Sequence, residues 1–263
     1  MVRYFKLYYI LLCQNFQVQM EYKFDFIFGN ITTVLGQVVG IAFVWVIFQS
    51  IGDLNGWTLP QIMIIYGIAA LSIGLIDLFF NGIWRLNYYI RMGEFDRFMF
   101  RPIEPLFLIL SDLSSLHGLG NFFSGVVIIV QASIALDLTW DVVMIIFLCM
   151  TVVCGTFIGL SVNVIVATVS FWYVGYGNSI LFLMNRIRDF ARYPIDIFAK
   201  PLQIFLMWVM PFAFTSFFPA TFILRNEEFL SYAYFIPVVT VVICFFAYSF
   251  WQLGLNSYQS TGS

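Results

Sequence analysis

The segment of residues 93–105, "GEFDRFMFRPIEP", holds the side chains that come closest to forming a chemical site. Its acids are Glu94, Asp96 and Glu104. In this sequence they are the only candidate for a cluster of carboxylates that could act as general acid and base at a membrane surface. Two arginines stand between these acids, and arginine pairs readily with carboxylates. The pattern favours salt bridges over catalysis. We therefore expect no catalytic residue, and the chain by itself is not expected to be an enzyme.

Two other kinds of chemical site are not indicated. A nucleotide-binding loop requires G-x-x-x-x-G-K-[ST], yet Lys6, Lys23 and Lys200 each follow a residue other than glycine. The four cysteines and the single histidine show no spacing that is typical of zinc ligands. We expect no cofactor and no metal site in this chain, so any ATP must be bound by another polypeptide.

The composition is that of an integral membrane protein. Of the 263 residues, 62% are hydrophobic and only 10% are charged, against about 25% charged in soluble proteins. A water-soluble chain of this length could not hide so much apolar surface. Membrane lipid is therefore an expected partner, and nucleic acid is not. No linker or low-complexity tract divides the sequence, so we expect one membrane domain over residues 1–263.

The gaps between charged residues predict an all-α protein with six transmembrane helices. A spanning helix needs about 20 predominantly apolar residues. The predicted spans lie at about 27–50, 61–80, 113–136, 142–171, 202–218 and 234–255. Residues 3–23 are expected to form an amphipathic helix in the membrane interface. The alternative for residues 3–23 is an ordinary cytoplasmic lead-in.

Residues 172–201 decide the topology. We expect residues 179–193 to form an amphipathic helix with Arg186, Arg188 and Arg192 toward water. A seventh, short span is the alternative. Six spans put all of the Lys and Arg residues except Arg225 on one side, which the positive-inside rule assigns to the cytoplasm. The six-span arrangement is therefore preferred, with both termini cytoplasmic.

This topology exposes residues 93–105 to the cytoplasm, between the second and third spans. The segment has room for about two helical turns, with Phe95 and Met99 on an apolar face and Glu94 and Arg97 at i,i+3 spacing. Exposed phenylalanines beside salt-bridging groups are typical of docking to a protein partner. Anchoring in the interface, with arginines on lipid phosphates, is the alternative.

Four stretches together resemble a known family. They are "GEFDRFMFRPIEPL", "FARYPIDIF" at residues 190–198, "MPFAFTSFFPATFIL" at residues 210–224 and "GLNSYQSTGS" at residues 254–263. In this order they are similar to segments of ABC-2 type exporter permeases, and specifically of a branch of short six-span proteins. The region before them agrees only in layout, as an interface helix, a span, a short outer loop and a span.

The resemblance implies the membrane-spanning permease subunit of an ATP-driven exporter in a bacterial cytoplasmic membrane. Such a complex pairs two permeases, identical or paralogous, with two cytoplasmic ABC ATPases that bind ATP and Mg. The segment after the second span would be the coupling helix, inserted into a cleft of the ATPase. The coupling residues carried over are Gly93, Glu94, Phe95, Asp96, Arg97, Arg101 and Pro102.

The outer end of the fifth span is interrupted by prolines, which remove backbone donors and kink helices. We expect residues 212–224 to form a hairpin that re-enters the membrane from outside. The residues expected to form an outer gate are Pro211, Phe214, Phe217, Phe218 and Pro219. The alternative is a span that ends at Pro211 with an aromatic belt.

Few polar groups fall inside the predicted spans. The candidates for lining a pathway are Gln131, Thr156, Ser161 and Asn163. Asp77 and Asp112 lie near span ends, and His117 lies deeper. Paired charges at mid-membrane would indicate an ion-coupled secondary transporter or channel, which is the alternative function. Because such pairs are not evident, we prefer ATP-driven export of an amphipathic or hydrophobic substrate, such as a drug or lipid.

Overall fold

The computed structural model describes residues 2–173, 177–225 and 228–259. In these parts of the chain the named elements are all helical, and Leu54 and Trp57 form an isolated bridge. Among the described residues, five helices are long and apolar enough to cross a membrane: Lys23–Ser50, Leu59–Arg91, Gly118–Ala135, Val142–Phe171 and Ile236–Ser257. The all-α class is confirmed, and these helices coincide with five of the six predicted spans.

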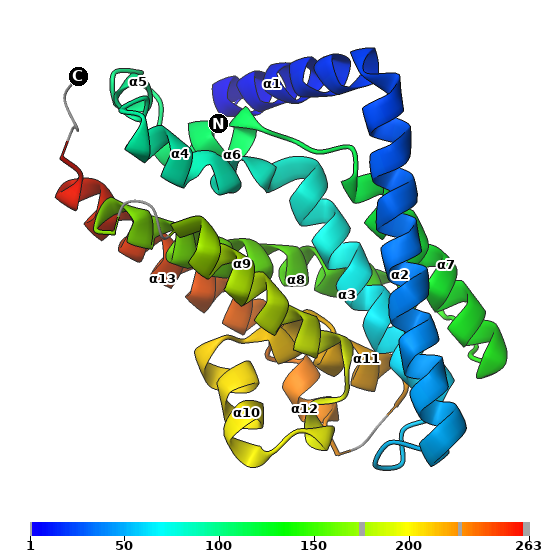
Figure 1. Cartoon of the computed structure of the whole chain (residues 1–263). Coiled ribbons are helices and arrows are strands. Elements are labelled where there is room, and N and C mark those ends of the chain that lie inside the picture. Colours follow the sequence, from blue (N-terminus) through cyan, green and yellow to red (C-terminus); the bar gives the residue numbers. More distant parts are fainter. Residues whose placement is uncertain (1, 174–176, 226–227, 260–263) are drawn as a thin grey trace.

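Helix α1 (Val2–Glu21) lies across one end of the molecule, and α2 (Lys23–Ile51) runs from it to the other end (Figure 1). Tyr4 and Tyr8 of α1 place their rings against Phe107. The Tyr8 hydroxyl donates a hydrogen bond of 2.9 Å to the Phe79 carbonyl. Burial raises the pKa of Tyr8 to about 12, and the hydrogen bond of its hydroxyl attaches α1 to the bundle.

Helix α3 (Leu59–Phe80) lies at the centre of the bundle and is buried along most of its length. It packs closely against α7 (Gly118–Ala135). A Cβ atom added at Gly74 would lie 2.9 Å from the Gly118 carbonyl oxygen, and one added at Gly118 would lie 2.5 Å from that of Gly74. Glycine at both positions therefore lets the two backbones touch, as small residues do between membrane helices.

Several short elements connect α3 to α7 at the α1 end. They are η1 (Asn81–Arg85), α4 (Leu86–Arg91), α5 (Asp96–Met99) and α6 (Pro105–Asp112). Residues 113–117 then lie outside the helices. The third span was predicted to begin at residue 113, but the helix begins at Gly118.

Helix α8 (Val142–Thr168) continues into η2 (Val169–Phe171) and packs along α13 (Ile236–Ser257). The Asp141 carboxylate caps α8 by accepting a hydrogen bond of 2.7 Å from the Met144 amide. The other end of α8 lies beside the C-terminal end of α13, where the rings of Phe171 and Trp251 are 5.2 Å apart. In Figure 1 this pair of helices runs obliquely to α2, on the other side of α3.

The chain then returns along α8 as α9 (Gly177–Arg188) and η3 (Asp189–Arg192). Beyond them, in η4 (Ile195–Ile197), Asp196 accepts hydrogen bonds of 2.8 Å from Trp57 and 3.3 Å from Asn55. Residues 171–196 therefore pass from the α1 end to the loop between α2 and α3. The expectation that the arginines of this region all face water beside the α1 end is wrong.

Residues 202–218, the predicted fifth span, do not form one continuous helix. The chain forms α10 (Lys200–Ile204), a π-helical turn η5 (Phe205–Val209), η6 (Phe212–Thr215), α11 (Phe217–Ile223) and α12 (Leu230–Ala233). The physical reason for the break is Pro211, which cannot donate a backbone hydrogen bond to a continuing helix. Figure 1 shows α10 at the same end as the loop between α2 and α3, so Lys200 does not belong with the charges at the α1 end.

Candidate functional site

The cap segment, residues 93–105, covers the α1 end of the helices. Gly93 turns the chain with φ at +70°, a conformation that favours glycine because other residues carry a Cβ. Helix α5 follows as a single turn. Phe95 and Phe98 are buried, at 0% and 2% exposure, whereas Phe100 is 86% exposed. The expected apolar docking stripe is corrected accordingly: Phe95 points into the protein, and Phe100 is the ring that a partner can reach.

An aromatic cluster holds the cap segment in place. The Phe95 ring lies 4.7 Å from that of Tyr258 and 5.2 Å from that of Phe171. The Tyr258 hydroxyl donates a hydrogen bond of 2.8 Å to Asp96. Aromatic pairs at these distances contribute about 0.5–1.5 kcal/mol beyond burial. The cap segment is thereby fixed to the ends of both α8 and α13.

Each acid of the cap segment has a structural partner. Glu94 forms an exposed ion pair of 3.6 Å with Arg97. Glu104 accepts a hydrogen bond of 3.0 Å from the Phe107 amide at the start of α6, and a second bond of 3.3 Å from Gln252. Because these acids serve local structure, they do not form the paired carboxylates that hydrolytic chemistry needs.

The outer surface of the cap segment is both apolar and basic. We call this surface, together with the adjoining Met92, the docking face, and its exposed residues are Met92, Arg97, Met99, Phe100, Arg101 and Pro102. The Arg97 guanidinium lies 4.8 Å from the centre of the Tyr89 ring and 4.9 Å from that of Phe98. These contacts hold the charge in a defined place, which suits recognition of an acidic, partly apolar surface.

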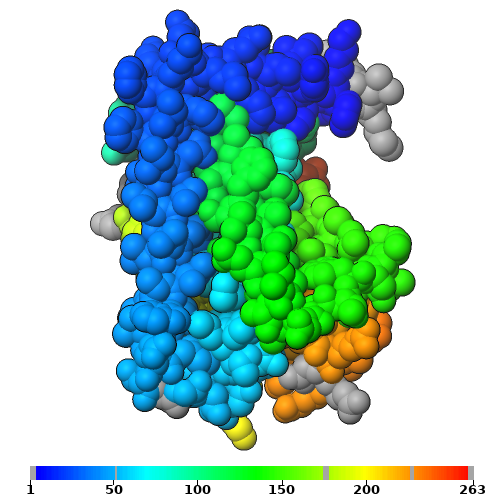
Figure 2. Space-filling model, turned by 90° about the vertical axis from the view of Figure 1, so that its right-hand side faces the viewer, coloured from blue at the N-terminus to red at the C-terminus, as the bar shows by residue number. Residues whose placement is uncertain are grey.

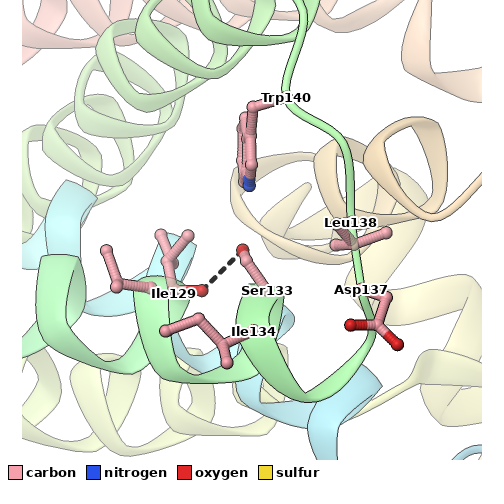
Figure 3. A pocket seen from close by; sticks show the side chains of 7 residues that line it. Ile129, Ser133, Ile134, Asp137, Leu138 and Trp140 are labelled. Carbon is pink, nitrogen blue, oxygen red and sulfur yellow. Dashed lines mark hydrogen bonds between the residues drawn. The ribbon is translucent and has the colours of Figure 1, made fainter.

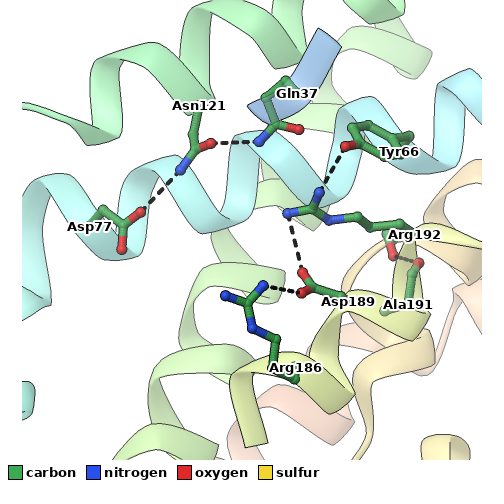
Figure 4. Close-up of polar contacts among 9 residues, drawn as sticks. Gln37, Tyr66, Asp77, Asn121, Arg186, Asp189, Ala191 and Arg192 are labelled. Atoms are coloured by element: carbon green, nitrogen blue, oxygen red, sulfur yellow. Dashed lines mark hydrogen bonds and ion pairs between the residues drawn. The ribbon is translucent and has the colours of Figure 1, made fainter. Parts of the chain in front are cut away.

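A polar network runs through the bundle (Figure 4). The Gln37 amide of α2 donates a hydrogen bond of 2.6 Å to Asn121 of α7, and Asn121 donates one of 3.1 Å to Asp77 of α3. Nearer the other end of α3, the Arg192 guanidinium donates a hydrogen bond of 2.8 Å to the Tyr66 hydroxyl. The positions of Tyr66 and Asp77 are about 16 Å apart along a regular helix.

Part of this network borders a cavity of about 200 Å³ between α3, α8 and α9. We call it the polar pocket, and its polar lining consists of Asp77, Asn163, Asn185, Arg186, Arg188, Asp189 and Arg192. Asp189 pairs with Arg186 at 3.4 Å and with Arg192 at 3.2 Å. The sequence showed no evident paired charges inside the membrane, and this expectation is corrected, because α9 and η3 bring three arginines to the cavity that Asp77 lines.

The four predicted pathway residues do not converge. Asn163 borders the polar pocket and accepts a hydrogen bond of 3.2 Å from Asn185. The Ser161 hydroxyl instead donates to Cys244 of α13 at 3.3 Å, and that of Thr156 donates to the Val152 carbonyl at 2.8 Å. Gln131 lines a groove between α2 and α7, which lie side by side on the face in Figure 2.

The predicted gate residues are all buried at the end of the bundle opposite α1. We call them the outer cluster: Pro211, Phe214, Phe217, Phe218 and Pro219. The Phe217 ring lies 5.6 Å from that of Trp57, and Phe218 stacks on Tyr232 at 5.0 Å. An apolar cavity of about 450 Å³ beside Pro211 and Phe214 separates η5 from α13.

A further cavity, of about 510 Å³, lies at the end of α7 (Figure 3). Ile129, Ile134 and Trp140 supply much of its wall. The Ser133 hydroxyl donates a hydrogen bond of 2.7 Å to the Ile129 carbonyl. The one titratable group in this lining is Asp137, so we assign the cavity no chemical role.

The helical fold and the five apolar, membrane-length helices found among the described residues define a multi-pass membrane protein. The family model described as "ABC-2 family transporter protein" matches residues 34–262. The chain therefore belongs to the ABC-2 transporter family, as the sequence motifs predicted. It is a transport membrane subunit, and membership implies partnership with an ABC ATPase. No curated protein and no solved structure matches the chain.

Proposed function

We propose that the chain is the permease subunit of an ATP-driven exporter that moves an amphipathic or hydrophobic substrate out of the cytoplasm or the inner leaflet. The observation that carries the proposal is the docking face. It offers Phe100 and two arginines to a partner, while Phe95 ties the same segment to α8 and α13. A force on the docking face would thus reach two membrane helices. The partner ATPase would bind ATP and Mg.

The proposed topology has six crossings, with both termini in the cytoplasm of a bacterium. In it, α1 lies in the membrane interface, and α9 with η3 makes the fifth crossing. Two contacts support the fifth crossing. Phe171, before α9, packs on Trp251 at one end of the bundle, and Asp196, after η3, accepts a hydrogen bond from Trp57 at the other end. Residues 200–233 then form the re-entrant outer segment, in which the outer cluster is the gate.

A second permease subunit, identical or paralogous, would cover the side of α9. The Arg186 side chain is 65% exposed, and a charged group at membrane depth is strongly disfavoured against lipid. If the α9 sides of two permease subunits enclosed a water-filled conduit, Arg186 would face water and its charge would not be exposed to lipid. Each polar pocket would then face the conduit, and two ATPases would complete the complex.

Co-purification with the ATPase tests the docking face. Affinity-tagged chain is extracted in mild detergent, and the retained ABC ATPase is quantified by mass spectrometry. We expect Arg97→Glu to lower retention by about ten-fold or more, because a reversed charge at an interface is repelled. Arg225→Glu, at an exposed position away from the cap segment, is the matched control. Equal retention by Arg97→Glu and wild type would refute the proposed docking.

The polar pocket favours one other candidate function, an ion-coupled secondary transporter. Asp77 and three arginines line one cavity within the bundle, and charges in such places serve proton and ion relays. Liposomes that contain the chain without an ATPase distinguish the two functions. Flux driven by a proton gradient alone supports the secondary transporter, whereas flux that requires ATPase and ATP supports the exporter.

A further inference from the structure

We propose that the polar pocket is an anion subsite that binds the carboxylate or phosphate group of an amphipathic molecule with one negative charge. This inference rests on the proposed function, in which the pocket faces the conduit. It names the chemical class of the substrate, which the family assignment leaves open. Three observations carry it: the charge balance of the lining, the unpaired donors of two arginines, and the apolar walls beside them.

The charges that line the polar pocket do not cancel. Arg186, Arg188 and Arg192 supply three positive charges, and Asp77 and Asp189 supply two negative ones. The lining therefore has a formal charge of +1. A cavity of low dielectric constant strengthens the attraction of such a charge for an anion. A ligand with one negative charge would neutralise the pocket, whereas a cation would add to the excess.

The arginines also present donors that the protein does not use. Within the part of the chain that the structure describes, the Nε and Nη1 atoms of Arg188 are buried without a hydrogen-bond partner, as is the Nε atom of Arg192. Asp189 pairs with Arg186 and Arg192. Asp77 and Asp189 also attract the charge of Arg188, but among the described residues neither carboxylate comes within 4.0 Å of its guanidinium. Buried donors without partners are rare in native proteins. An oxyanion suits them because guanidinium binds carboxylate and phosphate through two parallel hydrogen bonds.

The remaining lining of the polar pocket indicates what kind of molecule would carry the anionic group. Ile73, Trp84 and Phe182 form apolar walls beside the arginines. The Arg186 guanidinium lies 4.7 Å from the centre of the Phe182 ring. The volume of about 200 Å³ is below the range of about 300–1,000 Å³ for sites that enclose a drug-sized molecule. The pocket therefore fits a head group, with its apolar part lying along the walls and out of the opening.

Isothermal titration calorimetry of the full-length permease in neutral detergent tests the subsite. The probes are dodecanoate and the phosphodiester dodecyl methyl phosphate, each with one negative charge, and dodecanol is the neutral molecule of equal chain length. We expect both anions to bind at least about ten-fold more tightly than dodecanol, because charge-assisted hydrogen bonds add to the shared apolar contact. Equal affinity for the anions and for dodecanol would overturn the inference.

Two arginine variants locate the site. Arg186→Gln and Arg188→Gln are each expected to weaken dodecanoate binding by about ten-fold and to leave dodecanol binding unchanged. Arg225→Gln makes the same change at an exposed position away from the pocket and should bind as wild type does. Arg186 is the safer change for folding because its side chain is 65% exposed. If Arg186→Gln and Arg188→Gln both keep their melting temperature and their affinity, the pocket is not the site.

Two further experiments are needed. The first tells whether the bound anion is a lipid head group or a free amphiphile, and the second tells whether a negative result contradicts the subsite or the proposed function. In nanodiscs, phosphatidylglycerol in place of phosphatidylcholine lowers dodecanoate affinity if a lipid head group is the occupant, and leaves it unchanged if a free amphiphile is. Retention of the ABC ATPase by Arg186→Gln is measured in parallel. Normal retention without anion binding by the wild type overturns the subsite alone, whereas no retention by the wild type overturns the proposed function.

Discussion

The cap segment and the polar pocket use the same kinds of residue in opposite arrangements. In the cap segment, Phe95 and Phe98 are buried and Arg97 is exposed. In the polar pocket, the guanidinium of Arg188 is largely buried, while the neighbouring ring of Phe182 is 53% exposed. The first arrangement gives the cap segment a rigid outer surface, as the proposed docking requires, because apolar burial fixes the backbone. The second leaves donors inside the bundle, where they are available to a ligand.

The largest effect is expected from Phe95→Ala. Removing a fully buried phenylalanine costs about 3–5 kcal/mol because a cavity remains. The lost ring also separates the cap segment from Phe171 and Trp251. We expect a lower melting temperature of the purified protein in detergent, and lower ATPase retention as a consequence.

Phe100→Ala is the matched control for that variant, since it removes the same side chain where it is 86% exposed. It should keep the wild-type melting temperature and still lower ATPase retention. If both variants melted alike, the division between a buried anchor and an exposed contact would be wrong.

Asp189→Asn should have the next largest effect. This change removes the carboxylate that pairs with both Arg186 and Arg192. An unpaired, partly buried charge then costs on the order of 1–3 kcal/mol, so the melting temperature should fall less than in Phe95→Ala. The lost negative charge should also raise the affinity for dodecanoate in the same calorimetric titration. A decrease in that affinity would show that Asp189 shapes the pocket more than it sets its charge.

Tyr258→Phe tests the bond between the C-terminal segment and the cap segment. It removes the hydroxyl that donates to Asp96 at 2.8 Å and keeps the ring beside Phe95. The net loss should be about 1 kcal/mol. We expect reduced stimulation of ATPase activity by a transported amphiphile in nanodiscs containing the full complex. Tyr248→Phe, at an exposed position of the preceding helix α13, should not change that stimulation.

The position of the cap segment could be predicted from the sequence because its signals are local. Gly93 supplies a positive φ, and a dense group of charges in an apolar chain marks a boundary of the membrane. Which rings point inward could not be predicted. The burial of Phe95 depends on Phe171 and Tyr258, which lie far away in the sequence.

The course of α9 could not be predicted by counting positive charges. The positive-inside rule places arginines in loops, and it does not consider arginines that the fold neutralises internally. One local signal was nevertheless present. Arg186, Asp189 and Arg192 are spaced at i,i+3, and they pair with one another along one side of the chain. Such internal pairing lowers the free-energy cost of burying these charged residues in the bundle. The hydrogen bond of Arg192 to Tyr66, by contrast, could not be read from the sequence.

The smallest effect on stability, and the sharpest contrast with the polar pocket, is expected from Glu94→Gln. Its ion pair with Arg97 is 3.6 Å long, and the two side chains are 40% and 47% exposed. Exposed pairs of this kind contribute about 0–1 kcal/mol, so the melting temperature should stay close to that of the wild type. Any change in ATPase retention then reports on the docking face itself. A melting temperature as low as that of Asp189→Asn would mean that the charges of the cap segment stabilise the fold as much as those of the pocket do.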